Sequence, residues 1–425
     1  MTPLARDRDF GALWLARLVS AAGDWLLMIA LPVYVFALTG STLATSAVFA
    51  AELAPALLLG SVAGVLVDRW DPRRTLITVN LVQAVVLLPL LAVAGRGQLW
   101  IVVAVAVAQS CLARLTGPAS FALVPVIAGA ERLPAANALL GVGDNAARLV
   151  GSPLGGVVFD LGGLPGVVLV DAVTFVLAGA LVTLVRVRRP AAVAGPAGGF
   201  LRSWLDGLLV VRRSRPLLTV FVANGIGQLA QGLFLVLFVV FVERRLDGDG
   251  AAVGLLRGVQ AIGAVLGGLA LAWLGRRLRP AAMLGYGLLA IGVILLATWN
   301  APAVSTALGL YVALFVLAGV PAMALGTGML TVAQASTPAS HLGRVAGASE
   351  ATSAALGGVG VLLGGLLGDR VGLTALLDGQ ACLYLVAGLL TLALLGPAVR
   401  VPRPDPAGPA PRAEVAPAEP AGTTG

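Results

Sequence analysis

Long runs of apolar residues, separated by short polar breaks, make up most of the chain. A bilayer core about 30 Å thick needs roughly 20 apolar residues per helix. Twelve runs long enough to cross it cover residues 10–38, 42–67, 74–95, 98–126, 134–159, 164–186, 216–242, 251–275, 281–299, 303–334, 342–368 and 372–396. They are continuously apolar, without the alternation of barrel strands. The sequence therefore predicts an all-α membrane protein with twelve transmembrane helices.

Composition excludes several kinds of chemistry. All 28 basic residues are arginine, so the chain has neither the lysine of a Walker A loop nor a lysine for a Schiff base. The single histidine, His341, rules out a zinc site of the HExxH kind. Cys111 and Cys382 lie inside apolar runs and indicate neither a disulfide framework nor a metal cluster. We expect no enzyme activity, no cofactor and no metal, with a proton gradient as the energy source.

The placement of the arginines predicts the orientation. With the amino terminus in the cytoplasm, 20 arginines fall in inner segments and 4 in outer ones. Cytoplasmic loops retain arginine, so we expect both termini in the cytoplasm and the chain in the inner membrane. The net charge of +8 then reports topology and contact with an anionic lipid leaflet, and it does not point to nucleic acid.

The longest internal connection divides the chain into halves. We expect a six-helix bundle at 1–186, a cytoplasmic linker at 187–215, a second six-helix bundle at 216–397 and a disordered tail at 398–425. The halves resemble each other in register, because Gly151 falls on Gly360 and Asp160 on Asp369 at an offset of 209 residues. Such parallel repeats indicate two pseudo-symmetric bundles with a substrate site between them.

The segment between the second and third runs carries the first motif. It reads Gly64-Val65-Leu66-Val67-Asp68-Arg69-Trp70-Asp71-Pro72-Arg73-Arg74. This resembles the loop signature G-x-x-x-D-R-x-G-R-R of the major facilitator superfamily, with Asp71-Pro72 in place of the usual glycine. The resemblance implies that Gly64 allows close helix packing and that Asp68, Arg69, Arg73 and Arg74 latch the two halves and gate their alternation. The alternative is a loop whose arginines only mark the cytoplasmic side.

The fifth run carries a second motif, Gly151-Ser152-Pro153-Leu154-Gly155-Gly156. It is similar to the G-P-x-x-G-G signature of antiporters of that superfamily, with Ser152 replacing the glycine before proline. Gly151, Gly155 and Gly156 permit tight helix contact and Pro153 bends the helix, although packing alone would also explain them. Together with Gly117-Pro118-Ala119, these fragments resemble the branch of macrolide-type drug exporters and enterobactin-type siderophore exporters over residues 8–397.

Charges at membrane depth are costly, so each is a candidate for function. Those considered for proton coupling are Asp24, Glu52, Arg114, Asp144, Arg148 and Glu350. Asp24 is the leading proton carrier, with a permanent ion pair to Arg17 or Arg148 as the alternative. Because they lie four residues apart, Asp144 and Arg148 share a helical face, and we expect them to pair. The resemblance implies that Arg114 influences proton affinity.

The other polar groups in the apolar runs are expected to have structural or substrate-binding roles. Asp171 and Asp378 are expected to be interfacial or helix-pairing groups, and Arg257 to be shallow enough to extend toward the headgroups. Glu350 has a contact between the halves as its alternative role. The side chains expected to line a substrate cavity are Trp25, Asn224, Gln228 and Gln231, with hydrogen bonds between helices as the alternative for the amides.

These observations predict a secondary active transporter that exports an amphipathic, drug-like molecule in exchange for protons. Its partners would be the lipid bilayer, a small-molecule substrate and protons, and we expect a monomer. Two alternatives remain open. One is a siderophore or metabolite exporter, or an importer, on the same fold. The other is a membrane sensor or assembly protein that does not transport.

Overall fold

The structure, a computed structural model, describes residues 7–53, 55, 70–129, 132–186, 208–274, 278–337 and 341–395. Within these residues the chain forms helices and no strands. The long helices are α1 (Arg8–Thr39), α3 (Pro72–Leu87), α4 (Leu99–Ala128), α5 (Leu133–Thr183), α7 (Arg215–Arg245), α8 (Gly250–Leu274), α9 (Pro280–Asn300), α10 (Leu308–Ser336), α11 (Leu342–Gly368) and α12 (Leu373–Leu395). Short 3-10 turns are η2 (Leu88–Ala92), η3 (Arg96–Gln98) and η6 (Ala301–Ala303).

The helices account for the twelve predicted spans. Ten described helices are long and apolar enough to cross a membrane, and Thr42–Leu53 is a shorter apolar helix that covers part of the second predicted run. α5 covers the fifth predicted run and most of the sixth. Between the two runs Gly163 breaks the helical conformation, with φ 59° and ψ −164°. This conformation is open to glycine almost alone. The chain doubles back there, since both Gly151 and Asp171 of α5 approach α1 near Gly23. The predicted fold class is therefore confirmed.

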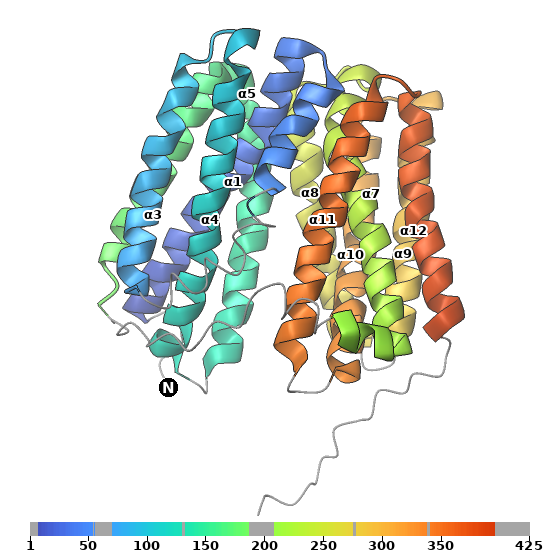
Figure 1. The fold of residues 1–425 in the computed structure, drawn as a ribbon. Coiled ribbons are helices and arrows are strands. Elements are labelled where there is room, and N and C mark those ends of the chain that lie inside the picture. The colour runs from blue at the N-terminus through green and yellow to red at the C-terminus, as the bar shows by residue number, and fades with distance from the viewer. Residues whose placement is uncertain are drawn as a thin grey trace, which may run out of the picture.

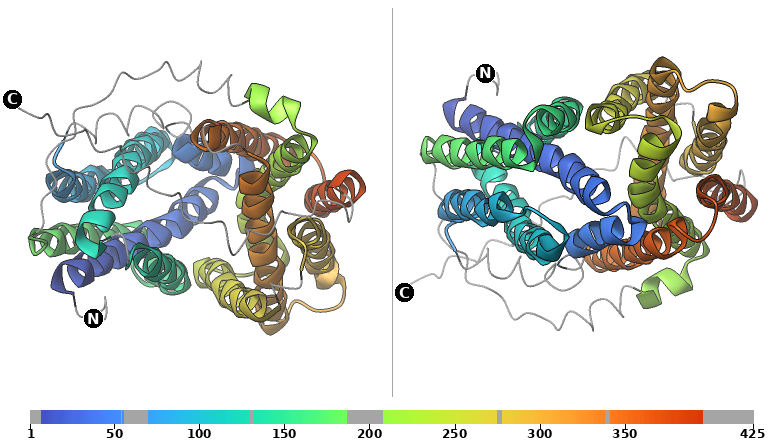
Figure 2. Two further views of the ribbon diagram at one scale, coloured as in Figure 1. Left: turned by 90° about the horizontal axis from the view of Figure 1, so that it is seen from below. Right: turned by 90° about the horizontal axis from the view of Figure 1, so that it is seen from above.

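The helices gather in two groups that stand side by side (Figures 1 and 2). The first group contains α1, α3, α4 and α5, with α1 packed along α5. The second contains α7 to α12, where α11 packs on α7, α12 on α9 and α10 on α8. The predicted linker 187–215 lies largely outside the described residues, which begin again at 208 with a helical turn up to 213. The predicted tail 398–425 also lies outside them.

Glycines in equivalent places join helices in both groups. A Cβ added to Gly151 would lie 2.4 Å from the carbonyl oxygen of Ala22, so α5 and α1 touch through their backbones. At the matching place in the second group, a Cβ on Gly360 would lie 2.2 Å from the carbonyl oxygen of Leu229, which joins α11 to α7. Gly155 meets α1 in the same way at Leu26. The sequence repeat is thus also a repeat of helix contacts.

Candidate functional site

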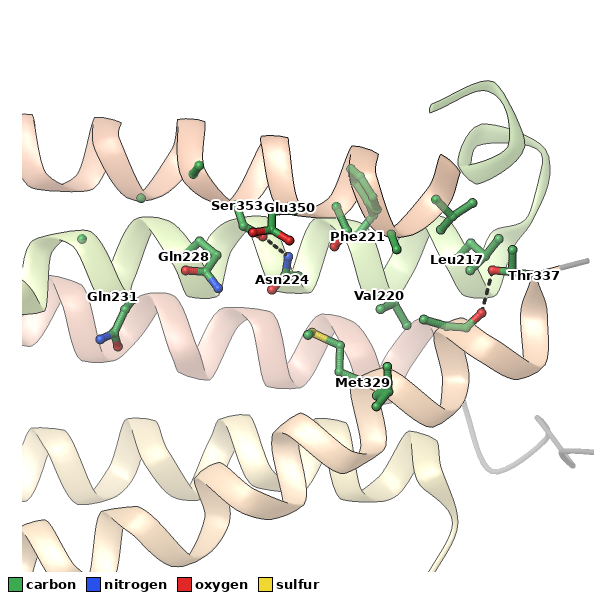
Figure 3. Close-up of a pocket in the computed structure, with 18 of the residues that line it drawn as sticks. Leu217, Val220, Phe221, Asn224, Gln228, Gln231, Met329, Thr337, Glu350 and Ser353 are labelled. Carbon is green, nitrogen blue, oxygen red and sulfur yellow. Dashed lines mark hydrogen bonds between the residues drawn. The ribbon is translucent and has the colours of Figure 1, made fainter. Parts of the chain in front are cut away.

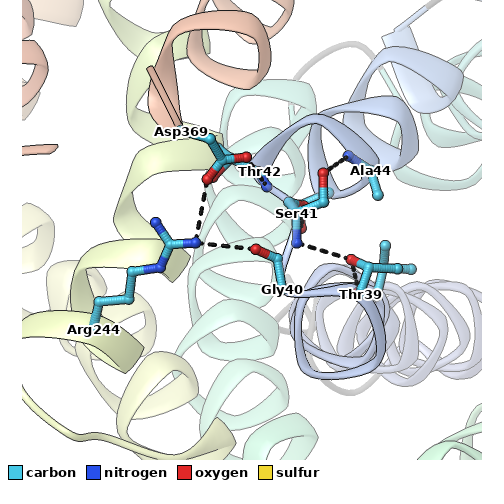
Figure 4. Close-up of polar contacts among 9 residues, drawn as sticks. Thr39, Gly40, Ser41, Thr42, Ala44, Arg244 and Asp369 are labelled. Carbon is cyan, nitrogen blue, oxygen red and sulfur yellow. Dashed lines mark hydrogen bonds and ion pairs between the residues drawn. The ribbon is translucent and has the colours of Figure 1, made fainter. Parts of the chain in front are cut away.

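Asp369 fastens the two groups together at the end of the molecule where α11 stops. Its carboxylate accepts hydrogen bonds from the backbone N–H of Thr42 at 3.0 Å and from the Thr42 hydroxyl at 2.7 Å. Arg244 of α7 donates to the same carboxylate at 3.2 Å and to the carbonyl oxygen of Gly40 at 3.0 Å (Figure 4). The second group therefore holds the amino end of the helix Thr42–Leu53, which belongs to the first.

Asp160 makes the equivalent contact in the opposite direction, from the first group to the second. This residue of α5 accepts hydrogen bonds from the backbone N–H groups of Gly250 at 3.2 Å and of Ala251 at 2.8 Å, at the amino end of α8. A carboxylate at a helix amino terminus satisfies unpaired N–H groups and complements the helix dipole. Since Asp160 and Asp369 are repeat mates, one carboxylate from each group caps a helix of the other. We call Asp160, Asp369 and their partners the paired caps.

The Asp369 cap stays charged at neutral pH. Burial raises the pKa of Asp369, but hydrogen bonds from Thr42 and Arg244, with the charge of Arg244, outweigh it and hold the pKa below its ordinary value of 3.8. The guanidinium of Arg244 also lies over the ring of Phe36, 5.1 Å from its centroid. At neutral pH this end of the molecule is therefore joined by an ionised carboxylate.

Close backbone contact continues the junction inward from the paired caps. A Cβ on Gly156 would lie 2.1 Å from the carbonyl oxygen of Gly250, and one on Gly258 would lie 2.8 Å from the Pro153 ring. Ser152, Pro153 and Gly156 of the motif thus pack on α8, whereas Gly151 and Gly155 pack on α1. Farther along the same two helices, Arg148 donates a hydrogen bond to the side-chain oxygen of Gln260.

A cavity of about 620 Å³ lies between the groups, because Leu53 and Arg114 line it together with residues of α7, α10 and α11, several of which Figure 3 labels. It extends along α7 from Leu217, near the start of that helix, to Leu235. Eighteen helical residues span roughly 27 Å, so this large cavity reaches from the end of the bundle opposite the paired caps to beyond the middle of α7. Apolar side chains of α7, α10 and α11 form most of its wall, and Asn224 donates to the Ser353 hydroxyl at 2.7 Å.

The side chains predicted for a substrate cavity line cavities, and so do two of those considered for proton coupling, Arg114 and Glu350. Asn224, Gln228, Gln231, Arg114 and Glu350 all line the large cavity. The Glu350 side chain is exposed, and the Nε of Arg114 is buried without a hydrogen-bond partner among the described residues. Trp25 instead lines a second, adjoining space.

This second space, which we call the inner chamber, has a volume of about 440 Å³ and shares Gln231 with the large cavity. It is lined by Trp25 and Arg148 of the first group and by residues of α7 to α10 and α12 in the second. Arg257 lies here, only 6% exposed, with its guanidinium 4.9 Å from the centroid of Phe234. The prediction that Arg257 extends toward the headgroups was wrong, because its face of α8 turns inward between the groups.

Three acids come together on the other side of α1. Asp24 is exposed and interacts electrostatically with half-buried Glu52 and with Asp171. Asp171 is fully buried beside Gly23, accepts a hydrogen bond from the Thr174 hydroxyl at 3.1 Å, and has an Oδ2 without a partner. Of the two roles predicted for Asp171, interfacial or helix-pairing, the structure favours the second, because the second arm of α5 packs it against the middle of α1. Asp24 has no ion pair with any described residue.

Asp144 binds a different partner from the one predicted. Arg17 of α1 holds its two oxygens from two nitrogens, at 3.0 and 2.9 Å. Arg148, one turn along α5, points away toward Gln260 and lies over Trp25, 5.2 Å from the ring centroid. The predicted pair of Asp144 and Arg148 was therefore wrong, since each side chain finds a better-placed partner on another helix. The alternative pairing of Asp24 with Arg17 or Arg148 does not occur either.

The loop motif is only partly described. Gly64, Asp68 and Arg69 lie outside the described residues. Asp71 caps α3 by accepting from the backbone N–H of Arg73 at 2.9 Å, with Pro72 in the first helical turn, which is how the chain turns here without the usual glycine. Arg73 donates to the carbonyl oxygen of Thr183 at 2.6 Å, inside the first group, and exposed Arg74 lies 3.8 Å from Asp71.

Sequence reasoning missed the paired caps. Asp160, Arg244 and Asp369 fall in the breaks between the predicted apolar runs, and Thr42 begins the second run. The repeat aligned Asp160 with Asp369, and this signal was sufficient to single them out. Gln380 and Tyr384 of the inner chamber carried no comparable signal, because a polar residue within an apolar run does not show which way it faces.

Comparisons with known proteins agree with this architecture. The model of a family described as transmembrane secretion effector matches residues 1–418. The chain is 26% identical over 412 residues to an uncharacterised MFS-type transporter, YfiS, of Bacillus subtilis (strain 168), covering 92% of this chain and 94% of the relative. It is 21% identical over 366 residues to macrolide efflux protein A of Streptococcus pyogenes, covering 85% and 90% respectively.

Solved structures share the fold at lower identity. A bacterial homologue of the iron transporter ferroportin in an inward-facing state matches with a TM-score of 0.73 and 17% identity, covering 92% of this chain and 99% of the other. The outward-facing state of a bacterial ferroportin homologue matches with a TM-score of 0.62 and 18% identity, covering 91% and 99%.

Proposed function

Because the chain belongs to the transmembrane secretion effector family of the major facilitator superfamily, we propose that this membrane transporter is a proton-coupled exporter of an amphipathic, drug-like molecule. Membership of this family makes the protein a multi-pass membrane transporter. The coupling ion, the direction and the class of substrate are the proposal.

The observation that carries the proposal is the asymmetry between the two ends of the bundle. The paired caps and the contact between α5 and α8 join the groups at one end, while the large cavity lies between the groups toward the other. A site that opens to one side and is sealed on the other is what alternating access requires. The higher TM-score against the inward-facing ferroportin homologue supports the same interpretation.

The excess of arginine in the segments that lie on the same side as the termini supports cytoplasmic termini in the inner membrane. In that orientation the large cavity opens to the cytoplasm and the paired caps form the external gate. An exporter would load from the cytoplasm in this state. Export is favoured over import by the relative named macrolide efflux protein A, and nothing in the proposal requires more than one copy of the chain.

Asp24, Glu52 and Asp171 supply the proposed proton pathway. They converge without an ion pair to any basic side chain in the described residues. Like charges held together in a membrane favour states in which protons are bound. Asp24 is the exposed member, so it would exchange protons with water, while Asp171 is buried behind it.

Transport into inverted membrane vesicles tests the proposal. Wild-type vesicles should accumulate an amphipathic fluorescent substrate when a proton gradient is imposed and lose it when the gradient is collapsed. Asp24→Asn should abolish uphill accumulation while the protein stays folded and inserted.

Asp247→Asn is the matched control for the Asp24 variant. It makes the same chemical change in an exposed connection where φ is 48°, a conformation that asparagine also accepts. Uphill transport retained by Asp24→Asn would remove Asp24 from the coupling. No accumulation of any amphipathic substrate by the inserted wild-type protein would favour a sensor or assembly role.

A further inference from the structure

The inner chamber is positively charged. The charged side chains among its lining residues are Arg148 of the first group and Arg257 of the second, and no acidic residue is among the described residues that line it. Arg257 interacts electrostatically with the like-charged Arg148 and with Tyr384, which is also among the lining residues. The chamber therefore holds two cationic groups from opposite halves of the molecule without a counter-ion in the described part of the chain.

Arg257 is the less compensated of the two. It is only 6% exposed, and it has neither a hydrogen bond nor an ion pair with any residue that the structure describes. Its contact with the face of Phe234 provides partial compensation at 4.9 Å. A buried guanidinium with five N–H donors is stabilised far better by an anion that accepts from them.

Arg148 is only partly satisfied. It donates to the side-chain oxygen of Gln260 and lies over Trp25, but its Nε is buried without a partner among the described residues. The acidic residue one turn away on the same helix, Asp144, pairs with Arg17 and is not available to Arg148. Both arginines of the chamber therefore keep donors for a ligand.

The amides of the chamber are turned so that they also offer donors. Gln380 is fully buried, and its oxygen accepts from the indole N–H of Trp299 at 3.1 Å. The indole only donates, so this contact fixes the amide orientation and leaves the Nε2 group, which has no partner, for the chamber. In the same way the oxygen of Gln260 is occupied by the donor-only group of Arg148. The Gln231 oxygen accepts from Tyr384 at 3.4 Å.

We propose that the inner chamber binds an oxyanion group of the transported molecule, a carboxylate or a phosphate, between Arg148 and Arg257, with the buried amide of Gln380 as a further donor. The proposal rests on the proposed function, which it narrows to amphipathic anions. The apolar body of such a molecule would lie in the large cavity, which joins the chamber at Gln231. Because one arginine comes from each half, the anion would bridge the halves at mid-membrane.

Binding of a matched set of aromatic probes to the full-length protein in lipid nanodiscs tests this assignment. The probes are 2-naphthoate, 2-naphthyl phosphate, neutral 2-naphthamide and cationic 2-naphthylmethylammonium, measured by calorimetry and by the shift in Tm. We expect both anions to bind about ten-fold or more tightly than the amide, and the cation to bind most weakly. The ratio of naphthoate to naphthyl phosphate affinity distinguishes a carboxylate site from a phosphate site.

Variants test the two arginines. Arg257→Gln and Arg148→Gln should each weaken naphthoate binding by about ten-fold or more. Arg257→Lys, which keeps the charge without the planar fork, should weaken it less. Arg245→Gln is the matched control, since that exposed arginine donates to Thr374 outside the chamber. Each variant must keep the wild-type Tm within a few degrees in the absence of probe, and Arg257→Lys serves if Arg257→Gln does not fold.

The assignment is overturned if the cation binds as tightly as the anions, or if neither anion binds folded protein at millimolar concentration. It is also overturned if both arginine variants bind naphthoate like the control. These results are separable from the proposed function. If the anions bind but no uphill transport occurs, the anion site stands and proton-coupled export is refuted. If the protein exports a cation and Arg257→Gln does not change that export, the proposed function stands and the anion site is refuted.

Discussion

Removing the paired caps should shift the molecule toward a state open at that end. The perturbation is Asp160→Ala combined with Asp369→Ala. Each carboxylate accepts two hydrogen bonds from the amino end of a helix in the other group, at 2.7–3.2 Å. Loss of such a cap costs about 1 kcal/mol. The Arg244 ion pair, with side chains 42% and 38% exposed, adds little.

The expected shift follows from these energies. Because each contact crosses between the groups, its loss destabilises the closed state and leaves the open state unchanged. One variant should shift the equilibrium about five-fold toward opening, and the double variant about thirty-fold.

Distances between spin labels at Gly97→Cys and Val304→Cys would report the shift. Both positions are exposed at the capped end, one in each group. The native cysteines would first be replaced by Cys111→Ser and Cys382→Ser. Asp378→Ala is the matched control, because Asp378 accepts from Asn300 at 2.8 Å within the second group. An unchanged distance distribution in the double variant would refute the interpretation of these carboxylates as a gate.

Three further predictions follow from particular residues. With its pKa held below 3.8, Asp369 should keep the capped end closed from pH 8 down to about 5 and release it only as the pH falls through that lowered pKa; opening near pH 6.5 in the same label distances would contradict this. Gly163→Ala should lower the free energy of unfolding by about 1–3 kcal/mol in thermal denaturation, while Gly162→Ala, the neighbouring control with no atom within 4 Å, should lower it less. Gly156→Ala should force α5 and α8 apart at Gly250 and lengthen the label distance, whereas Gly141→Ala in the same helix should not; equal distances in the two variants would remove this contact from the gate.

The sequence was sufficient to predict the fold because hydropathy in a membrane protein is a direct record of what faces lipid. The break between the fifth and sixth runs fell close to Gly163, where the chain reverses. The sequence was less informative about which charged side chains pair with each other. Spacing along one helix suggested that Asp144 pairs with Arg148, but the stronger partner, Arg17, comes from a helix more than a hundred residues earlier.

The sequence also did not predict how deep a polar side chain lies or which way it faces. Arg257 lies seven residues into α8, and counting from the helix end made it shallow, although that end is covered by α5 and Asp160. For Asp171 the sequence left an interfacial and a helix-pairing role open, and only its burial against Gly23 favours helix pairing. A run of apolar residues does not show which of its polar members point inward, so these assignments require the packing of neighbouring helices.

The most direct test of alternating access is a pair of distance measurements on the two ends of the same protein. One label pair is Gly97→Cys with Val304→Cys at the capped end, and the other is Arg74→Cys with Leu278→Cys at the opposite end, all exposed positions. In the double variant Asp160→Ala with Asp369→Ala, the first distance should lengthen and the second should shorten. Lengthening at the capped end with no change at the other would mean local fraying and would contradict alternation of the two groups about a central cavity.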